Sequence, residues 1–351
     1  MTLTDHLIAR IRASGPLSMA DYMADCLLHP QFGYYSTRDP FGAAGDFVTA
    51  PEISQMFGEL IGLALAQAWL DQGAPGRFVL AELGPGRGTL MADALRATAR
   101  VPGFVQAAEV WLVEASASLR ARQRQVLAGH DVQWVDSVAG LPEAPLYLVA
   151  NEFFDALPVR QFQREGGGWR ERRVGLEGGV LTLGLAGAGP QAALAHRLAD
   201  TKDGDIVELC PAATPILGEV ARRIARNGGA ALIVDYGDWR SLGDTVQALK
   251  AHRPVPVLET PGEADLTAHV DFEVLSQAAQ AEGCAASRMT PQGLFLERLG
   301  ITARAETLAR ADAEGTAAAH RRLTHPDEMG NLFKVLGLCP PGAPPLAGLD
   351  P

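Results

Sequence analysis

A glycine-rich turn constrains this 351-residue chain more than any other feature of its sequence. The apolar run Phe78–Leu83 leads directly into Gly84-Pro85-Gly86-Arg87-Gly88, and a helical pattern follows over 88–100. Glycines allow a sharp turn and a close approach of a ligand to the backbone, while the first turn of a helix offers N–H groups. The pattern therefore predicts a strand-turn-helix unit that binds a nucleotide-like cofactor.

The spacing of the glycines separates two classes of cofactor. Dinucleotide enzymes use G-x-G-x-x-G, whose third glycine would fall where this chain has Thr89. The spacing GxGxG, with an acid two residues before the first glycine, instead matches S-adenosylmethionine-dependent methyltransferases. We therefore expect S-adenosylmethionine as the cofactor, bound at Glu82, Gly84, Gly86 and Gly88, and we rank a nicotinamide dehydrogenase last among the alternatives.

Acidic residues follow the next two predicted strands. Val110–Glu114 ends in an acid 26 residues beyond Gly88, near the position of the ribose-binding acid in doubly wound nucleotide sites. We expect Glu114 to bind both ribose hydroxyls, with a solvated strand end as the alternative. Asp136 follows Val132–Val135 and is a candidate for the adenine amino group, although an exposed loop acid is an equal alternative.

Short apolar runs alternate with helical stretches in the manner of a parallel α/β sheet. We expect a Rossmann-like, class I methyltransferase sheet whose helices include 88–100 and 117–128. Later runs at 284–289 and 332–336 could supply the closing strands. The predicted strands of the core are Phe78–Leu83, Val110–Glu114, Val132–Val135, Leu146–Ala150 and Ala231–Asp235.

The chain begins with an expected helical extension over residues 4–28. Thr4 and Ser18 are candidate N-caps, and Gly15-Pro16 breaks the helical pattern. The following segment, 29–51, is rich in Gly, Pro and aromatic residues and predicts an irregular loop of the kind that often carries function. A helix is expected over 52–70.

The sequence pattern changes between Val159 and Leu185 and predicts antiparallel β hairpins inserted into the sheet topology. Strand-like pieces there are separated by runs of glycine at 166–168 and 178–179. We therefore predict five regions along the chain: N-terminal helices with a cofactor-covering loop (1–75), a cofactor-binding core (76–158), inserted hairpins (159–204), the remaining core with helical additions (205–339) and a loose tail (340–351).

The net charge and the cysteine positions limit which partners, metals and cellular locations are expected. Thirty basic and 41 acidic residues give a net charge of −11, which disfavours nucleic acid and anionic lipid surfaces. The apolar stretch 61–70 is half of the length needed to cross a bilayer. The four scattered cysteines show no metal-ligand spacing, so we expect no metal, a reducing compartment and a bacterial cytoplasmic location, or the mitochondrial matrix if the chain is eukaryotic.

A polar cluster follows the strand Leu146–Ala150. Ligands gather at the carboxyl ends of strands in an open α/β sheet, so Asn151, Glu152 and Asp155 lie where a methyl acceptor should enter. Carboxylates could hydrogen-bond a guanidinium while the rings of Phe153 and Phe154 pack on its plane. The alternative is a helix N-terminus in which Asn151 is the cap and the acids favour the helix dipole.

Motifs along nearly the whole chain resemble the MidA family of mitochondrial and bacterial methyltransferases, whose mitochondrial member assists assembly of respiratory complex I. The residues that carry the resemblance are Gly45–Glu52, Phe57–Glu59, the glycine turn, Asn151–Pro158, Asp235–Gly237, Asp265–Phe272, Gln292–Leu296 and Met329-Gly330.

The resemblance implies a Rossmann-like enzyme that symmetrically dimethylates an arginine on the quinone-side subunit of complex I. It places Asp46 and Thr49 in a loop that covers the cofactor, and Tyr236 and His269 on the acceptor side. Each has a structural alternative: Asp46 and Thr49 as turn formers, Tyr236 as a packing ring and His269 as a structural histidine.

We expect Glu152 to be the main catalytic residue. A guanidinium is a poor nucleophile because its charge is delocalised, and Glu152, supported by Asp155 and Asn151, could localise that charge away from the attacking nitrogen. Two other functions remain open: methyl transfer to another amide or amine, and a non-catalytic complex I assembly chaperone. The sequence leaves the oligomeric state and the methylated protein open.

Overall fold

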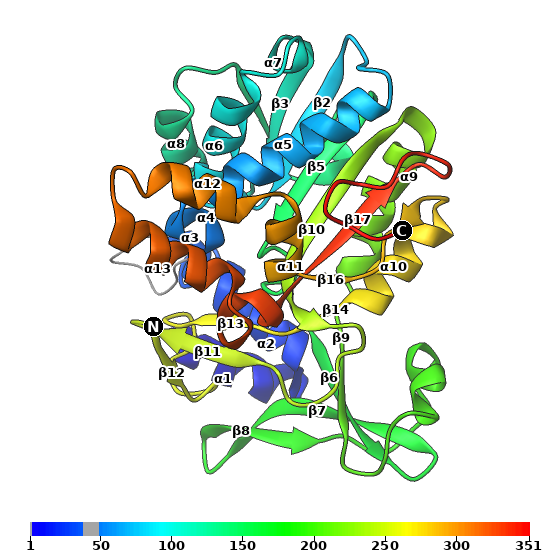
Figure 1. The fold of residues 1–351 in the computed structure, drawn as a ribbon. Helices are drawn as coiled ribbons and strands as arrows, with labels where there is room; N and C mark the ends of the chain where they lie inside the picture. The colour runs from blue at the N-terminus through cyan, green and yellow to red at the C-terminus, as the bar shows by residue number, and fades with distance from the viewer. Residues whose placement is uncertain (1, 38–48) are drawn as a thin grey trace. The chain divides into compact units, whose positions relative to one another are not determined.

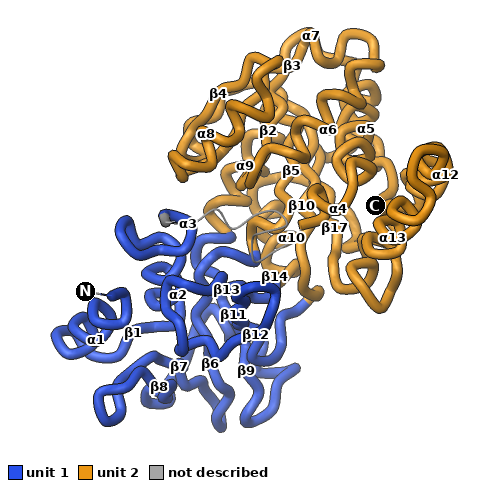
Figure 2. Tube along the Cα trace, turned by 90° about the vertical axis from the view of Figure 1, so that its left-hand side faces the viewer, with its two compact units in different colours: residues 1–47, 155–213, 240–269 blue, residues 48–154, 214–239, 270–351 orange. Residues whose placement is uncertain are grey.

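The computed structural model describes residues 2–37 and 49–351. These residues form two compact units, and Figure 2 colours the segments of each. Unit 1 comprises 1–47, 155–213 and 240–269, and unit 2 comprises 48–154, 214–239 and 270–351. Each unit is therefore assembled from separate stretches of the chain, and the five regions expected from the sequence stay a prediction about domain boundaries.

Unit 2 is built on a mixed sheet with the strand order β15-β17-β10-β5-β2-β3-β4 (Figure 1). The neighbours from β10 to β4 pair in parallel, and β17 adds an antiparallel strand to β10. The α/β fold class is confirmed. The bounds of its strands are β2 Phe78–Leu83, β3 Ala108–Val113, β4 Val132–Val135, β5 Leu146–Asn151, β10 Gly229–Asp238, β14 Val270–Asp271, β15 Ala285–Ala286, β16 Thr290–Pro291 and β17 Phe333–Cys339.

Both faces of this sheet are covered, because all six residues of β2 and of β5 are buried. Phe78 and Leu80 belong to the same apolar cluster as the residues of the long helix α5, which packs on β5 and β10. Val79 and Ala81 point to the opposite face by strand alternation and are equally buried. Such continuous apolar strands are typical of parallel sheets covered by helices.

Most helices belong to unit 2. Those bounds are α4 Ala50–Ile53, α5 Gln55–Asp71, α6 Thr89–Thr98, α7 Phe104–Ala107, α8 Ala117–Val126, α9 Ala213–Asn227, α10 Phe272–Ala281, α11 Gln292–Arg298, α12 Ile301–Leu308 and α13 Ala313–Thr324, with a 3₁₀ turn η1 Val138–Gly140 and a π turn η3 Pro326–Gly330.

Two expectations for unit 2 were wrong. The helix predicted over 52–70 is two helices, because Ser54 is extended (φ −161°, ψ 140°) and its side chain accepts a hydrogen bond from the backbone of Met56. The residues 340–351 are not a loose tail. Leu346 and Leu349 are buried in the main apolar cluster, and the carbonyl of Asp350 accepts a hydrogen bond from Arg288.

Unit 1 contains an antiparallel sheet in the order β1-β7-β6-β9, with β8 paired to β7, and a small sheet β12-β11-β13. The predicted antiparallel hairpins are confirmed. The bounds of its elements are α1 Leu3–Ser14, β1 Leu17–Ser18, α2 Met19–Leu28, α3 Tyr34–Thr37, β6 Arg160–Glu165, β7 Gly168–Glu177, β8 Val180–Leu185, the 3₁₀ turn η2 Ala192–Leu198, β9 Ile206–Leu209, β11 Gln247–Lys250, β12 Arg253–Val255 and β13 Asp265–Thr267.

The first helices begin at residues with capping side chains. Ser18 caps α2 as predicted, but Thr4 is not a cap, because the helix begins two residues earlier, with a capping box formed by Thr2 and Asp5. The described parts of the segment 29–51 are also less irregular than expected, since short helices occupy 34–37 and 50–53. Among the described residues, no helix has the length and apolar character that a membrane span needs.

Candidate active site

The glycine turn has the backbone that its sequence predicts. Gly84, Gly86 and Gly88 all have positive φ, at 59°, 52° and 86°, a region that side chains with a β-carbon rarely adopt. A β-carbon at Gly84 would lie 2.8 Å from Cδ2 of Phe153. The turn therefore needs glycine both for its conformation and for the close packing against Phe153.

Glu82 ends β2 as a carboxyl group that is 3% exposed. Its Oε2 has no hydrogen-bond partner among the described residues. Burial raises the pKa of Glu82 to about 8, although a hydrogen bond from the backbone of Met91 opposes the shift. A buried carboxyl with unused acceptor capacity suits a ligand that brings hydrogen-bond donors or positive charge, which is what the amino group of S-adenosylmethionine would supply.

Glu114 is held at the end of β3 by two hydrogen bonds. Its Oε1 accepts from the backbone of Ser116 at 2.7 Å, and its Oε2 accepts from Nε2 of Gln123 at 3.3 Å. Burial raises the pKa of Glu114, against the effect of these bonds. Each carboxylate oxygen keeps a further lone pair, so the arrangement fits the proposed ribose contact.

Gln123 on α8 is a residue that the sequence analysis missed. It is fully buried, its Nε2 donates to the carbonyl of Gly86 at 2.8 Å, and its Oε1 accepts from Nε1 of Trp134 at 2.8 Å. Its position was detectable, because Leu119, Gln123 and Leu127 recur at four-residue spacing and are all buried. A polar side chain on an apolar helical stripe is a reason to expect a specific partner.

Asp136 lies just beyond β4, as predicted, and its side chain is 84% exposed. Nη2 of Arg120 is 2.5 Å from Asp136, and Nε of the same guanidinium donates to the carbonyl of Glu114 at 2.7 Å. Arg120 thus links the two acids predicted for the cofactor. The adenine contact of Asp136 stays a prediction.

The short helix α4 connects the ends of two strands. The backbone N–H of Ala50, which follows the predicted cofactor residue Thr49, donates to Oε1 of Glu152 at 3.1 Å. Oε1 of Glu52 accepts from the hydroxyl of Thr89 at 2.5 Å, and Oε2 of Glu52 is 3.9 Å from Nη1 of Arg87. The start of α4 is therefore tied both to the glycine turn and to the end of β5. The other predicted loop residue, Asp46, lies outside the described residues.

Glu152 has an unusual backbone, with φ at 51° in a residue that is not glycine. Its N–H donates to the carbonyl of Val234 on β10, and its Oε1 accepts from Nδ2 of Asn151 at 3.2 Å. Oδ1 of Asn151 is buried and has no partner among the described residues. Left-handed backbone of this kind costs free energy and often occurs at functional sites.

No helix begins within residues 151–158, all of which the structure describes. The alternative interpretation of this segment as a helix N-terminus is therefore wrong. The backbone N–H of Phe154 instead donates to Oδ2 of the fully buried Asp235 at 2.9 Å. The polar residues after β5 therefore lie in a non-helical turn, and their side chains do not stabilise the N-terminus of a helix.

The predicted aromatic residues have different surroundings. Phe153 packs on Gly84 and meets Phe154 edge to face, with ring centroids 5.2 Å apart. Tyr236 is buried and packs edgewise on Phe333 at 5.4 Å. Phe153 therefore lies at the glycine turn, and Tyr236 has the packing role that was its alternative. Any contact of Tyr236 with an acceptor stays a prediction.

Asp155 and His269 both belong to unit 1, and a backbone hydrogen bond joins the segments that contain them. The carbonyl of Asp155 accepts a hydrogen bond from Ala268 at 2.9 Å, and the backbone N–H of His269 donates to the hydroxyl of Thr245 at 2.8 Å. Burial and the nearby carboxylates of Asp265 and Asp155 raise the pKa of Tyr35, whose hydroxyl donates to Asp265. The half-buried Tyr35 and the buried Asp265 are further polar residues of unit 1 to which the sequence analysis gave no role.

The strand-turn-helix at Glu82–Thr89 and the acid at the end of the next strand define the class: a Rossmann-like methyltransferase. A model of S-adenosyl-L-methionine-dependent methyltransferases matches residues 60–290. Mitochondrial protein arginine methyltransferase NDUFAF7 is 35% identical in Xenopus tropicalis, covering 99% of this chain and 89% of that protein. The Homo sapiens protein is 36% identical, covering 95% and 82%.

A solved structure from Burkholderia thailandensis, bound to S-adenosyl-homocysteine, is 32% identical and superimposes with a TM-score of 0.86 over 99% of this chain and 93% of that chain. The chain belongs to this family of S-adenosylmethionine-dependent methyltransferases, which confirms the resemblance drawn from its motifs and the expected cofactor. These two relatives are mitochondrial proteins, so they do not support the cytoplasmic location expected from the sequence.

Proposed function

We propose that this methyltransferase transfers the methyl group to a guanidinium nitrogen of arginine in a protein. The observation that carries the proposal is the carboxylate of Glu152 at the end of β5, with the buried Oδ1 of Asn151 beside it. Two oxygen acceptors suit the N–H groups of a guanidinium, which has donors and no acceptor. The names of the relatives support the same acceptor.

The residues would act mainly by positioning and electrostatics. Bound S-adenosylmethionine supplies a methyl group on a sulfonium, which a nitrogen must approach in line at near-attack distance. Glu82, Glu114 and the glycine turn would hold the cofactor. Glu152, with Asn151 and Asp155 in support, would orient the guanidinium and draw its positive charge away from the attacking nitrogen.

The strained backbone of Glu152 supports this assignment. The hydrogen bonds from Ala50 and Asn151 both go to Oε1 of Glu152, so they fix the carboxylate at the end of β5. A carboxylate held in this way is preorganised for a cationic ligand. Symmetric dimethylation, a complex I subunit as the substrate, and a location in the matrix or the bacterial cytoplasm are further parts of the proposal.

The test combines product analysis with one variant. Purified protein and deuterated S-adenosylmethionine are incubated with extract from a strain that lacks the gene, and hydrolysed protein is analysed by mass spectrometry for methylated residues. We expect symmetric dimethylarginine. Glu152→Gln should reduce methyl transfer by about 100-fold, comparable with the loss of one preorganised catalytic group, with unchanged cofactor affinity.

The matched control is Glu306→Gln on α12, because Glu306 is an exposed acid. It should leave transfer, cofactor affinity and melting temperature unchanged. Methyl label found on amides or amines and absent from arginine would contradict the proposed acceptor. Full transfer by a folded Glu152→Gln protein would remove Glu152 from the chemistry and leave Asp155 as the next candidate.

A further inference from the structure

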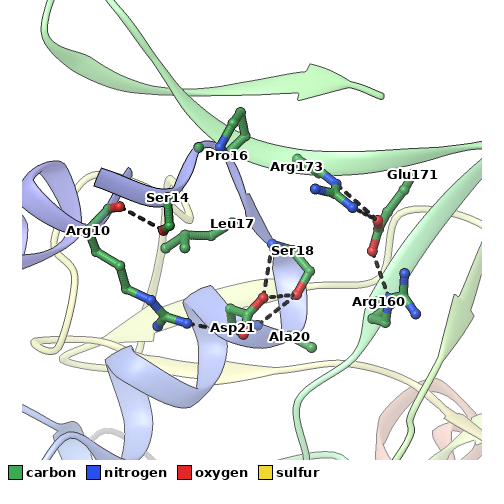
Figure 3. A pocket seen from close by; sticks show the side chains of 11 residues that line it. Arg10, Ser14, Pro16, Leu17, Ser18, Ala20, Asp21, Arg160, Glu171 and Arg173 are labelled. Carbon is green, nitrogen blue, oxygen red and sulfur yellow. Dashed lines mark hydrogen bonds and ion pairs between the residues drawn. The ribbon is translucent and has the colours of Figure 1, made fainter. Parts of the chain in front are cut away.

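Unit 1 contains a polar hollow of about 490 Å³ whose lining includes none of the residues assigned to methyl transfer. One wall is the turn between α1 and α2, and the other is formed by β6 and β7 (Figure 3). The charged and polar residues that matter are Arg10, Ser18, Asp21, Arg160, Glu171 and Arg173. Three arginines therefore line one hollow in a chain whose net charge is −11.

A buried carboxylate orients two of these arginines. Glu171 is 6% exposed, and its Oε1 accepts from Nε of Arg160 at 2.7 Å. Its Oε2 accepts from Nε and Nη2 of Arg173 at 3.0 and 2.7 Å (Figure 3). Two guanidinium groups share one carboxylate, so this triad carries one net positive charge in a fixed arrangement.

Both arginines keep donors for a ligand. Arg160 uses only Nε toward Glu171, and Arg173 keeps its Nη1 group, which makes no hydrogen bond to any residue that the structure describes. Their side chains are 38% and 41% exposed, so solvent and ligands reach them. The guanidinium of Arg160 also lies 5.0 Å from the ring centroid of the buried Phe162, which further fixes its plane.

The opposite wall contains the carboxylate of Asp21, which already accepts hydrogen bonds from neighbouring residues. Asp21 accepts from the hydroxyl and backbone N–H of Ser18, and from Nη2 of Arg10 at 3.2 Å. Nη1 of Arg10 is 2.5 Å from Asp25, so two carboxylates surround this third arginine and leave this wall with a net charge of −1. Asp21 therefore completes the capping box of α2 and would repel a dianion such as phosphate, while a single carboxylate could still bind the Arg160 and Arg173 side.

We propose that this hollow is a docking subsite for the carboxylate of an aspartate or glutamate on a protein partner, bound by Arg160 and Arg173. The planar forks of arginine match a carboxylate, and the net negative charge of the chain opposes non-specific binding of acidic proteins elsewhere. The proposal is independent of which residue receives the methyl group, because neither arginine belongs to the candidate active site.

The experiment measures fluorescence anisotropy of a labelled tetraglutamate peptide with the full chain, against a labelled tetraglutamine peptide. We expect the wild type to bind tetraglutamate at least about tenfold more tightly, the effect of one charge-assisted hydrogen bond. Arg160→Gln with Arg173→Gln should remove this preference. The control Arg77→Gln removes an exposed arginine that pairs with Glu109 in unit 2, and it should leave binding unchanged.

Three results would overturn the proposal: equal binding of the two peptides, unchanged preference in a folded double variant, or competition by inorganic phosphate as strong as competition by acetate. If the double variant does not fold, Arg160→Lys decides, because lysine keeps the charge and lacks the planar fork. A loss of the tetraglutamate preference in Arg160→Lys supports a bidentate carboxylate site, and an unchanged preference contradicts it.

Discussion

Glu82 is a carboxyl group that folding moves into an apolar environment, and its protonation should therefore control stability. Its folded pKa of about 8 lies above the ordinary value of 4.5. Between these values the unfolded chain has lost the proton that the folded chain keeps, so the free energy of unfolding falls as pH rises. Above about pH 8 both states are ionised and the contribution becomes constant.

The variant Glu82→Gln tests this pH dependence, because glutamine has nearly the shape of glutamate and cannot ionise. Without cofactor, the stability of the variant relative to the wild type should rise between about pH 5 and 8, by at most about 1.4 kcal/mol per pH unit, and level off above. Urea unfolding at several pH values measures the difference. Parallel pH profiles for the two proteins would show that Glu82 ionises normally in the fold.

Single residues of the site could be predicted from the sequence where the chemistry is local. The glycines follow a strand and precede a helix, so the turn conformation of Gly84 and its neighbours could be predicted. The position of Glu114 could be predicted because it directly follows the next strand. Asp265 could not be assigned in this way, because its bond to Tyr35 joins residues 230 positions apart. Contacts over such separations depend on the complete fold.

At the scale of elements, α8 is fixed to the glycine turn through Gln123. Replacing Gln123 with leucine keeps the apolar packing between Leu119 and Leu127 but leaves the carbonyl of Gly86 and the indole N–H of Trp134 without their partner. A buried polar group that loses its partner costs about 1–3 kcal/mol. We therefore expect lower stability and weaker S-adenosylmethionine binding.

Calorimetry with S-adenosylmethionine tests this expectation. The control Gln125→Leu changes an exposed residue of the same helix and should preserve cofactor affinity. Gln123→Glu offers a second comparison, because it keeps an acceptor for Trp134 and places a negative charge beside Glu114. Wild-type affinity in both Gln123 variants would mean that the glycine turn keeps its geometry without α8.

The order and type of the elements were more predictable than their ends. The strand at 78–83 was predicted with its observed bounds, because five buried apolar residues and Glu82 directly precede a glycine turn. The break at Ser54 was missed, since a serine side chain that bonds to the backbone of Met56 ends one helix and begins another without Gly or Pro. Pairing of β1 with β7 joins Leu17 to Val174 and has no local sequence pattern.

At the scale of the molecule, unit 1 depends on contacts between distant segments of the chain. The fully buried Tyr22, from its first segment, donates its hydroxyl to the carbonyl of Val257, from its third, at 2.7 Å. Tyr22→Phe should reduce the free energy of unfolding by about 1–3 kcal/mol, because the carbonyl loses its partner. Cofactor affinity should be unchanged, since the predicted contacts of Glu82 and Glu114 lie in unit 2.

Tyr147→Phe in unit 2 provides the matched control. The hydroxyl of Tyr147 is buried and has no hydrogen-bond partner among the described residues, so its removal should be neutral or stabilising. Thermal and urea unfolding of both variants measure the effect. Equal losses in the two would show that the cost arises from packing and that the bond to Val257 contributes little.

The place of β17 in the sheet has a consequence for synthesis on the ribosome. β10 lies between β5 and β17, and β17 spans residues 333–339, about a hundred residues after β10. While the nascent chain grows, β10 can pair with β5 but presents an open, apolar edge until β17 at residues 333–339 has emerged. An exposed edge strand invites pairing with other chains, so the period between translation of β10 and of β17 is when this protein most needs a chaperone.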